Sequence, residues 1–135
     1  LSATSNPEGA ALQKASVGGN TIAKQIWDGL GKINQVTAGA GESLGSFGAV
    51  IGATLNLPGF GLGDVQNGQD SAATPILAPG FGAQGAELGD VSRLFGDGAK
   101  QVIASVSRSV LRAGATGMPK AIEAANAELA AGLSA

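Results

Sequence analysis

Three glycines near the middle of the chain have the spacing of a turn that holds the phosphates of a dinucleotide. Gly80, Gly82 and Gly85 follow the pattern G-x-G-x-x-G and precede a segment that we expect to be helical. Such a turn works after a buried strand, in a sheet built from alternating strands and helices. Only Ile76 and Leu77 could supply that strand, and no such alternation is visible in the rest of the chain. With 23 glycines in 135 residues a chance match is expected, so we predict no bound cofactor.

The side chains that most often catalyse reactions or bind metals are missing or scattered. The chain has no histidine and no cysteine, which removes the commonest general base, the thiolate nucleophile and the usual ligands of zinc. A serine nucleophile would need a lysine or carboxylate partner, and no Ser-x-x-Lys sequence occurs. Asp90 and Asp97 lie seven residues apart, but Arg93 stands between them and favours a salt-bridged surface. We therefore predict that the protein is not an enzyme and binds no metal.

Four basic residues share one side of a segment that we expect to be helical, namely Arg93, Lys100, Arg108 and Arg112. This group could bind a phosphate or a lipid headgroup. Acidic residues nearby dilute its charge, so the solvated side of an amphipathic helix is the favoured interpretation. The net charge of −2 gives no electrostatic reason for nucleic acid to be a partner, and we predict none.

A long amphipathic pattern occupies residues 22–55. Its apolar members recur in steps of three and four, which places them on one side of a helix. They are Ile22, Ile26, Leu30, Ile33, Thr37, Ala40, Leu44, Phe47, Ile51 and Leu55. We interpret the segment as one long helix, with a break most easily placed at Gly39 to Gly41, where two glycines flank one alanine.

Glycines inside this predicted helix indicate close packing against a neighbour. Each costs roughly 1 kcal/mol relative to alanine, so the packing that they permit must offset the loss. Pairs four residues apart let two helix backbones approach each other. We predict that helix–helix or subunit contacts are made by Gly41, Gly45, Gly48, Gly52, Phe47 and Ile51.

The remaining patterns complete an all-α prediction: an antiparallel helical hairpin or a loose four-helix arrangement with one long Gly/Pro-rich loop. A Pro-Gly-Phe-Gly turn occurs near each end of that loop, at Pro58 and at Pro79. We expect a single domain over residues 1–135, with helices at about 7–17, 21–55, 88–113 and 119–131 and the loop at 56–87.

Composition and patterning together favour a non-catalytic structural protein that self-associates as a fibre, coat, secreted matrix or foam. A chain that starts at Leu1 without an initiator methionine suggests a removed signal peptide, so we predict secretion. Two alternatives stay open: a carrier of a small apolar ligand or lipid, and a membrane-active or surface-active helical protein. Ligand or interface contacts would then come from Trp27, Phe60 and Phe81. The expected partner is a second copy or a polymer of the same chain, with a membrane or lipid possible.

Overall fold

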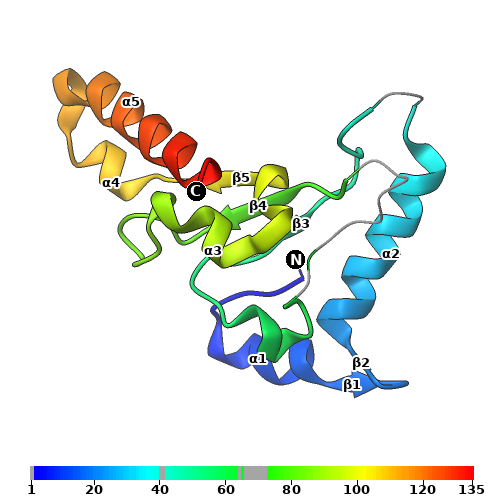
Figure 1. The fold of residues 1–135 in the computed structure, drawn as a ribbon. Helices are drawn as coiled ribbons and strands as arrows, with labels where there is room; N and C mark the ends of the chain where they lie inside the picture. The colour runs from blue at the N-terminus through cyan, green and yellow to red at the C-terminus, as the bar shows by residue number, and fades with distance from the viewer. Residues whose placement is uncertain (1, 40–41, 64, 66–72) are drawn as a thin grey trace.

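The protein is a mixed α/β structure built around a parallel sheet, as seen in a computed structural model that describes residues 2–39, 42–63, 65 and 73–135. The sheet contains β3 (Ala49–Val50), β4 (Ile76–Pro79) and β5 (Val102–Ser105), in the order β3-β4-β5. Figure 1 shows these strands side by side at the centre, with α2 and α5 on opposite flanks. Ala3 forms a further parallel bridge to Ile51, beside β3. The prediction of an all-α fold is therefore wrong.

The other elements connect and cover the strands. In chain order they are α1 (Pro7–Lys14), the antiparallel pair β1 (Ser16–Val17) and β2 (Asn20–Thr21), α2 (Ile22–Thr37), the 3-10 helices η1 (Leu57–Phe60) and η2 (Leu88–Asp90), α3 (Val91–Phe95), the 3-10 helix η3 (Gly96–Gln101), α4 (Arg108–Leu111) and α5 (Gly114–Leu133). Among the described residues, no helix combines the length and the apolar character needed to cross a membrane.

The predicted helix over 21–55 is wrong beyond Thr37, where α2 ends. Residues 49–51 pair with the segment of β4, and hydrogen bonds recur at every second position: the amides of Ala49, Ile51 and Ala53 each donate to a carbonyl of residues 75–79 at 2.8–3.0 Å. The run from Ala49 to Ala53 has no polar alternation, so a short apolar run of this kind looks like part of a helix. The expected bend at Gly39 to Gly41 falls partly on residues 40–41, which lie outside the described chain.

The other predicted helices agree with the structure to different extents. The segment predicted as one helix over 88–113 contains four short helical pieces with β5 among them, and the loop predicted over 56–87 contains β4. Two helices are close to their expected positions: α1 covers most of 7–17, and α5 contains all of 119–131. Segments that do not pair with the sheet form the helices that their local sequence pattern predicts. Segments that pair with distant strands do not form the predicted helix.

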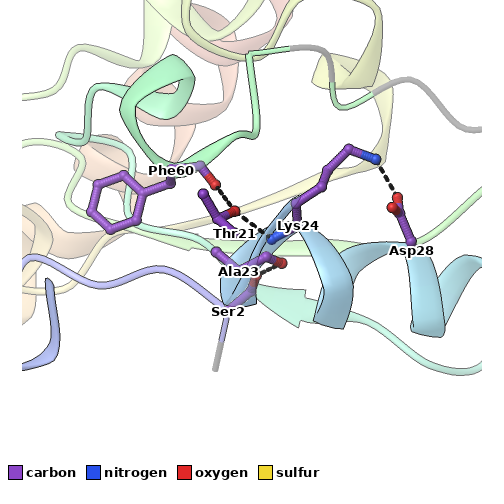
Figure 2. Close-up of polar contacts among 6 residues, drawn as sticks. All are labelled: Ser2, Thr21, Ala23, Lys24, Asp28 and Phe60. Atoms are coloured by element: carbon purple, nitrogen blue, oxygen red, sulfur yellow. Dashed lines mark hydrogen bonds and ion pairs between the residues drawn. The ribbon is translucent and has the colours of Figure 1, made fainter. Parts of the chain in front are cut away.

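Two other parts of the chain are hydrogen-bonded to the start of α2, as Figure 2 shows. Thr21 caps the helix, since its Oγ1 accepts the amide of Lys24 at 3.0 Å, and the same hydroxyl donates to the carbonyl of Phe60 at 2.6 Å. The buried Ser2 hydroxyl donates to the carbonyl of Ala23 at 3.0 Å. Lys24 also pairs with Asp28 one turn later. The first extended segment and the turn after β3 are thereby fixed to one helix end.

Asn34 makes the corresponding connection at the other end of α2. Its side chain is fully buried and bonds both backbone groups of Phe47: Oδ1 accepts the amide at 3.0 Å and Nδ2 donates to the carbonyl at 2.8 Å. Nδ2 also lies 3.2 Å from Oγ1 of the buried Thr74. One amide side chain thus links the helix to the segments that lead into β3 and β4.

The main core lies between one face of the sheet and the helices. Ile76 and Ala78 of β4 have no exposed surface, and Val91 and Phe95 of α3 pack with them. Trp27 reaches the same core from α2.

In the central sheet the strand order is sequential, from the Ala3 segment through β3 and β4 to β5, and all pairings within this sheet are parallel among the described residues. Doubly wound sheets reverse their strand order near the middle, whereas β/α barrels add each new strand beside the last. The arrangement therefore has the winding of a barrel. Side chains that follow parallel strands gather at one edge of the sheet, where barrels place their sites.

Candidate anion-binding site

A tight glycine-rich loop follows β4 at the carboxyl edge of the sheet. Residues 80–86 fold back on themselves: the Gly82 amide donates to the Ala86 carbonyl at 2.8 Å, and the Ala86 amide donates to the Gly80 carbonyl at 3.2 Å. Phe81 is 3% exposed and anchors the loop in the core. The loop is therefore a fixed structure and not a connector of variable shape.

Glycine is required at two positions of this loop. Gly80 has φ +121°, and a Cβ atom there would lie 3.5 Å from the backbone nitrogens of Ala53 and Thr54. Gly82 has φ +70°, and its Cβ atom would lie 2.7 Å from Oγ of Ser109. Residues other than glycine rarely adopt these backbone angles, and at Gly82 a Cβ atom would also collide with Ser109. The close approach of the loop to Ser109 therefore requires a glycine at the position of Gly82.

Two backbone donors are available at the tip of the loop. A turn over residues 82–85 is closed by the Gly85 amide, which donates to the Gly82 carbonyl at 3.0 Å. Within the described chain, the amides of Ala83 and Gln84, at the centre of this turn, donate no hydrogen bond. Successive unpaired N–H groups in a turn form a concave anion-binding surface, and the exposed Gln84 side chain adds an amide donor.

The strand end beside this loop carries a guanidinium group. β5 is followed by Ser107 and by Arg108, the first residue of α4, and both are exposed. The contact between Ser109 and Gly82 places this segment against the loop. A cavity of about 470 Å³ lies between residues 82–88, α4 and α5. Ala83, Gln84 and Arg108 are not among the residues that line this cavity, which include Glu87 and Glu128. The backbone amides of the loop and the arginine therefore belong to adjacent segments at one edge of the sheet, and donors of these kinds are suited to a phosphate group.

A second, smaller cavity of about 290 Å³ lies on the other side of the loop, toward β3. Thr54, Gln84 and Arg93 are among the residues that line it. Arg93 is paired with Asp90, and its hydrogen bond lowers the pKa of the Asp90 carboxyl below its usual value. The same bond raises the pKa of the Arg93 guanidinium, which stays charged at any physiological pH. Because its charge is already matched by Asp90, Arg93 is a weaker anion ligand than Arg108.

The structure changes how the glycine pattern must be judged. The sequence argues against a phosphate-binding turn at Gly80, Gly82 and Gly85 because only Ile76 and Leu77 could form the strand before them and no alternation of strands and helices is visible. β4 begins with these two residues and lies in a parallel sheet, so that argument is wrong. β4 precedes the loop, and a helical segment follows it at Leu88. The absence of a bound cofactor stays a prediction. For the part of the chain that is described, no three acidic residues lie close enough to hold a metal ion.

The sequence predicts that the four basic side chains share one face of one helix, and this prediction is wrong. Arg93 lies in α3, Lys100 in η3, Arg108 in α4, and Arg112 just beyond it. Only Arg108 follows directly after a sheet strand at the carboxyl edge. Arg108 is among the residues that the sequence indicates as possible phosphate ligands, but no local pattern connects it with the glycine loop.

The predicted contact glycines do make close approaches, but within this chain and outside any long helix. A Cβ atom at Gly45 would overlap the Asn34 side chain, and one at Gly48 would lie 2.7 Å from the Pro75 carbonyl oxygen. Gly52 faces Leu55 of its own turn, and Gly41 lies outside the described residues. Ile51 is fully buried in the core, whereas Phe47 is 45% exposed. A role of any of these residues at a subunit interface stays a prediction.

The three aromatic residues proposed as ligand contacts are core residues. Trp27, Phe60 and Phe81 are each less than 5% exposed, and none of them lines either cavity described above. Lys14 lies over the Phe60 ring, 4.7 Å from its centre. Their burial is explained by packing, and a role in ligand binding stays a prediction.

Comparisons with known proteins identify similar chains, although no family model matches. A protein of Salinispora arenicola, named orotidine 5'-phosphate decarboxylase, is 47% identical over 115 residues, which are 84% of this chain and 37% of that protein. Proteins of the same name from Streptomyces coelicolor and a Nocardioides species are 42% and 46% identical, over 84% and 83% of this chain and 37% and 38% of their own length.

A solved structure agrees with these relatives. It is described as a candidate orotidine 5'-phosphate decarboxylase from Streptomyces avermitilis, and it matches all of this chain and 45% of its own, with a TM-score of 0.80 and 38% identity. The chain thus spans less than half the length of each protein that it resembles.

These findings overturn the functional predictions made from composition. The predictions of a non-catalytic structural protein and of secretion are wrong, because the relatives are named as decarboxylases of a nucleotide, which are enzymes. In sequence and in fold, the chain is similar to a part of orotidine 5'-phosphate decarboxylases.

Proposed function

We propose that this chain supplies the phosphate-holding part of an orotidine 5'-phosphate decarboxylase. The observation that carries the proposal is the loop at residues 80–86, which presents the free amides of Ala83 and Gln84 beside the segment of Arg108. Barrel enzymes frequently bind phosphate with the loops after two neighbouring strands, and β4 and β5 are neighbours. The substrate in the relatives' name carries one phosphate group, which fits a single set of donors.

Holding the phosphate contributes to catalysis even though the phosphate does not react. Binding energy from a non-reacting part of a substrate can offset the cost of orienting and desolvating the reacting part. The described residues at the carboxyl edge provide donors to an anion and no cluster of acids. We therefore assign substrate anchoring to this chain, and the bond-breaking step to groups that lie in the parts of the longer relatives outside the match.

We also propose that the chain self-associates, so that its expected partner is another copy of the same chain. The absence of nucleic acid as a partner and a contact with membrane or lipid both stay predictions.

Replacing Arg108 by alanine is expected to weaken binding of orotidine 5'-phosphate by roughly tenfold or more, since a hydrogen bond between charged groups contributes about 1.5 to 3 kcal/mol. Isothermal titration of the 135-residue chain with orotidine 5'-phosphate, and with orotidine as the ligand without phosphate, measures this effect. The chain should bind the phosphorylated ligand and not orotidine. The exchange Gln84→Ala should weaken binding in the same direction.

The exposed Lys120 on α5 provides a control of equal charge. Lys120→Ala should leave the affinity unchanged, whereas a nonspecific electrostatic effect would lower it as much as Arg108→Ala does. Equal affinity for the two ligands, or full affinity in Arg108→Ala, would contradict the proposed phosphate site.

A further inference from the structure

The end of α5 packs directly against the backbone that follows the glycine loop. Gly132 is buried in the last turn of α5, and a Cβ atom there would lie 2.6 Å from the Gly89 carbonyl oxygen and 2.8 Å from that of Leu88. Leu88 and Gly89 begin η2, directly after the loop over residues 80–86. The close approach of the two backbones therefore requires a glycine at position 132, and it fixes the place where the chain leaves the loop.

Two hydrogen bonds join the same pair of segments in opposite directions. The Gly89 amide, in the first turn of the helical stretch formed by η2 and α3, donates to Oε1 of Glu128 at 3.2 Å. The Ser92 hydroxyl donates to the Gly132 carbonyl at 2.6 Å, in the last turn of α5. Amides of a first helical turn and carbonyls of a last turn have no partner within their own helix, so each of these helices caps the other.

Glu128 is the side chain that connects α5 with the exit of the loop. The cavity of about 470 Å³ lies between the loop and α5, and α5 contributes Ala121, Ala124, Ala125 and Glu128 to its lining. Alanine side chains end at Cβ, so among these four residues only Glu128 is long enough to reach across to the Gly89 amide. Because a cavity separates the body of the loop from α5, the contact at Gly89 is where this helix can act on the loop.

We propose that Glu128 is a positioning residue for the phosphate site, which acts through the Gly89 amide and not by contact with the ligand. Its carboxylate holds the start of η2, and η2 fixes the exit of the loop whose tip presents the amides of Ala83 and Gln84. The effect on binding rests on the proposed phosphate site, whereas the positioning is a property of the unliganded chain. A carboxylate repels a phosphate, so a loss of affinity when Glu128 is removed must come through the backbone that it holds.

Hydrogen exchange of the unliganded chain, followed for each amide by NMR, tests the positioning directly. In Glu128→Ala the Gly89 amide loses its acceptor and exchanges faster for that reason alone. The informative amides are those of Gly82 and Ala86, which donate to the carbonyls of Ala86 and Gly80 within the loop. Their protection should fall at least about threefold, because local opening of the loop becomes easier. Faster exchange at Gly89 alone would overturn the proposal.

Titration calorimetry with orotidine 5'-phosphate measures the consequence for binding. Glu128→Ala should raise the dissociation constant roughly threefold to tenfold, the size expected for the loss of one hydrogen bond. Unchanged affinity in this variant would overturn the positioning role. Equal affinity of the parent chain for orotidine and orotidine 5'-phosphate would instead contradict the proposed phosphate site, and the exchange data would still decide whether Glu128 positions the loop.

Two further variants separate the hydrogen bond from the charge. Glu128→Gln keeps an oxygen that can accept the Gly89 amide, so it should restore most of the protection and of the affinity. Glu123→Ala removes the same charge from an exposed position of α5 that does not line the cavity, and it should change neither quantity. If the carboxylate acted only by its charge, Glu128→Ala and Glu128→Gln would both bind the phosphate more tightly, and that result would overturn the proposal.

Gly132→Ala tests the same contact without changing a charged group. Alanine in place of glycine ordinarily stabilises a helix. Here the added methyl group would lie 2.6 Å from the Gly89 carbonyl oxygen, so the end of α5 must move away from η2. The melting temperature should therefore fall, and the Gly82 and Ala86 amides should lose protection as they do in Glu128→Ala. A raised melting temperature with unchanged protection of the loop would show that α5 does not position it.

Discussion

Replacement of Asn34 by leucine is expected to lower the free energy of unfolding by about 3 kcal/mol, since it leaves buried backbone groups without partners. Leucine has a similar volume, so the loss would come from hydrogen bonds and not from a cavity. The amide and the carbonyl of Phe47 lose their partner, and the Thr74 hydroxyl loses one as well. Thermal and urea unfolding measure the effect, and the melting temperature should fall by roughly 10 °C.

The neighbouring Gln35 is exposed on the same helix and serves as the control. Gln35→Leu changes the same kind of side chain one position away and should alter stability by less than about 0.5 kcal/mol. If Asn34→Leu were as stable as Gln35→Leu, the link between α2 and the segments before β3 and β4 would contribute nothing to the fold.

Replacement of Gly82 by valine is expected to abolish measurable binding of orotidine 5'-phosphate and to destabilise the chain by at least about 2 kcal/mol. Two effects combine here. A β-branched residue is strained at φ +70°, and its Cβ atom would lie 2.7 Å from Oγ of Ser109. The loop would then have to move away from the Arg108 segment, which separates the amide donors from the guanidinium. Titration calorimetry and thermal unfolding measure the two losses separately.

Gly85 provides a control that distinguishes the effect of backbone strain from the effect of the steric collision. It also has a positive φ, of +108°, but a Cβ atom there would meet no other atom within 4 Å. Gly85→Val should therefore destabilise the loop through strain alone and bind more tightly than Gly82→Val. Adding Ser109→Gly to Gly82→Val should recover part of the stability, since it removes the collision. Equal behaviour of Gly82→Val and Gly85→Val, with no recovery, would show that the contact with Ser109 does not position the loop.

Several features followed from the sequence alone because they depend on neighbours in the chain. Pro7 starts α1 after Asn6, as expected from a residue with φ already set for a helix. The apolar spacing over Ile22–Thr37 produced a helix at its predicted start, where Thr21 caps it. The expected last helix is present within α5. The glycine pattern at residues 80–85 was also visible, together with the capacity of Arg108 to bind phosphate.

The sheet could be recognised only in the tertiary structure. The same is true of the functional interpretation of the glycine pattern. β3 and β5 are only two and four residues long, and their partners in β4 lie about 26 residues away in the chain. Parallel strands of this kind have no local turn and no polar alternation to mark them, so apolar runs such as 49–53 fit a helical period equally well. Only when β4 and β5 pair do the glycine loop and Arg108 come to the same edge. The residue types and their local helices were readable from the sequence, whereas their convergence into a site depended on long-range hydrogen bonds that no local pattern encodes.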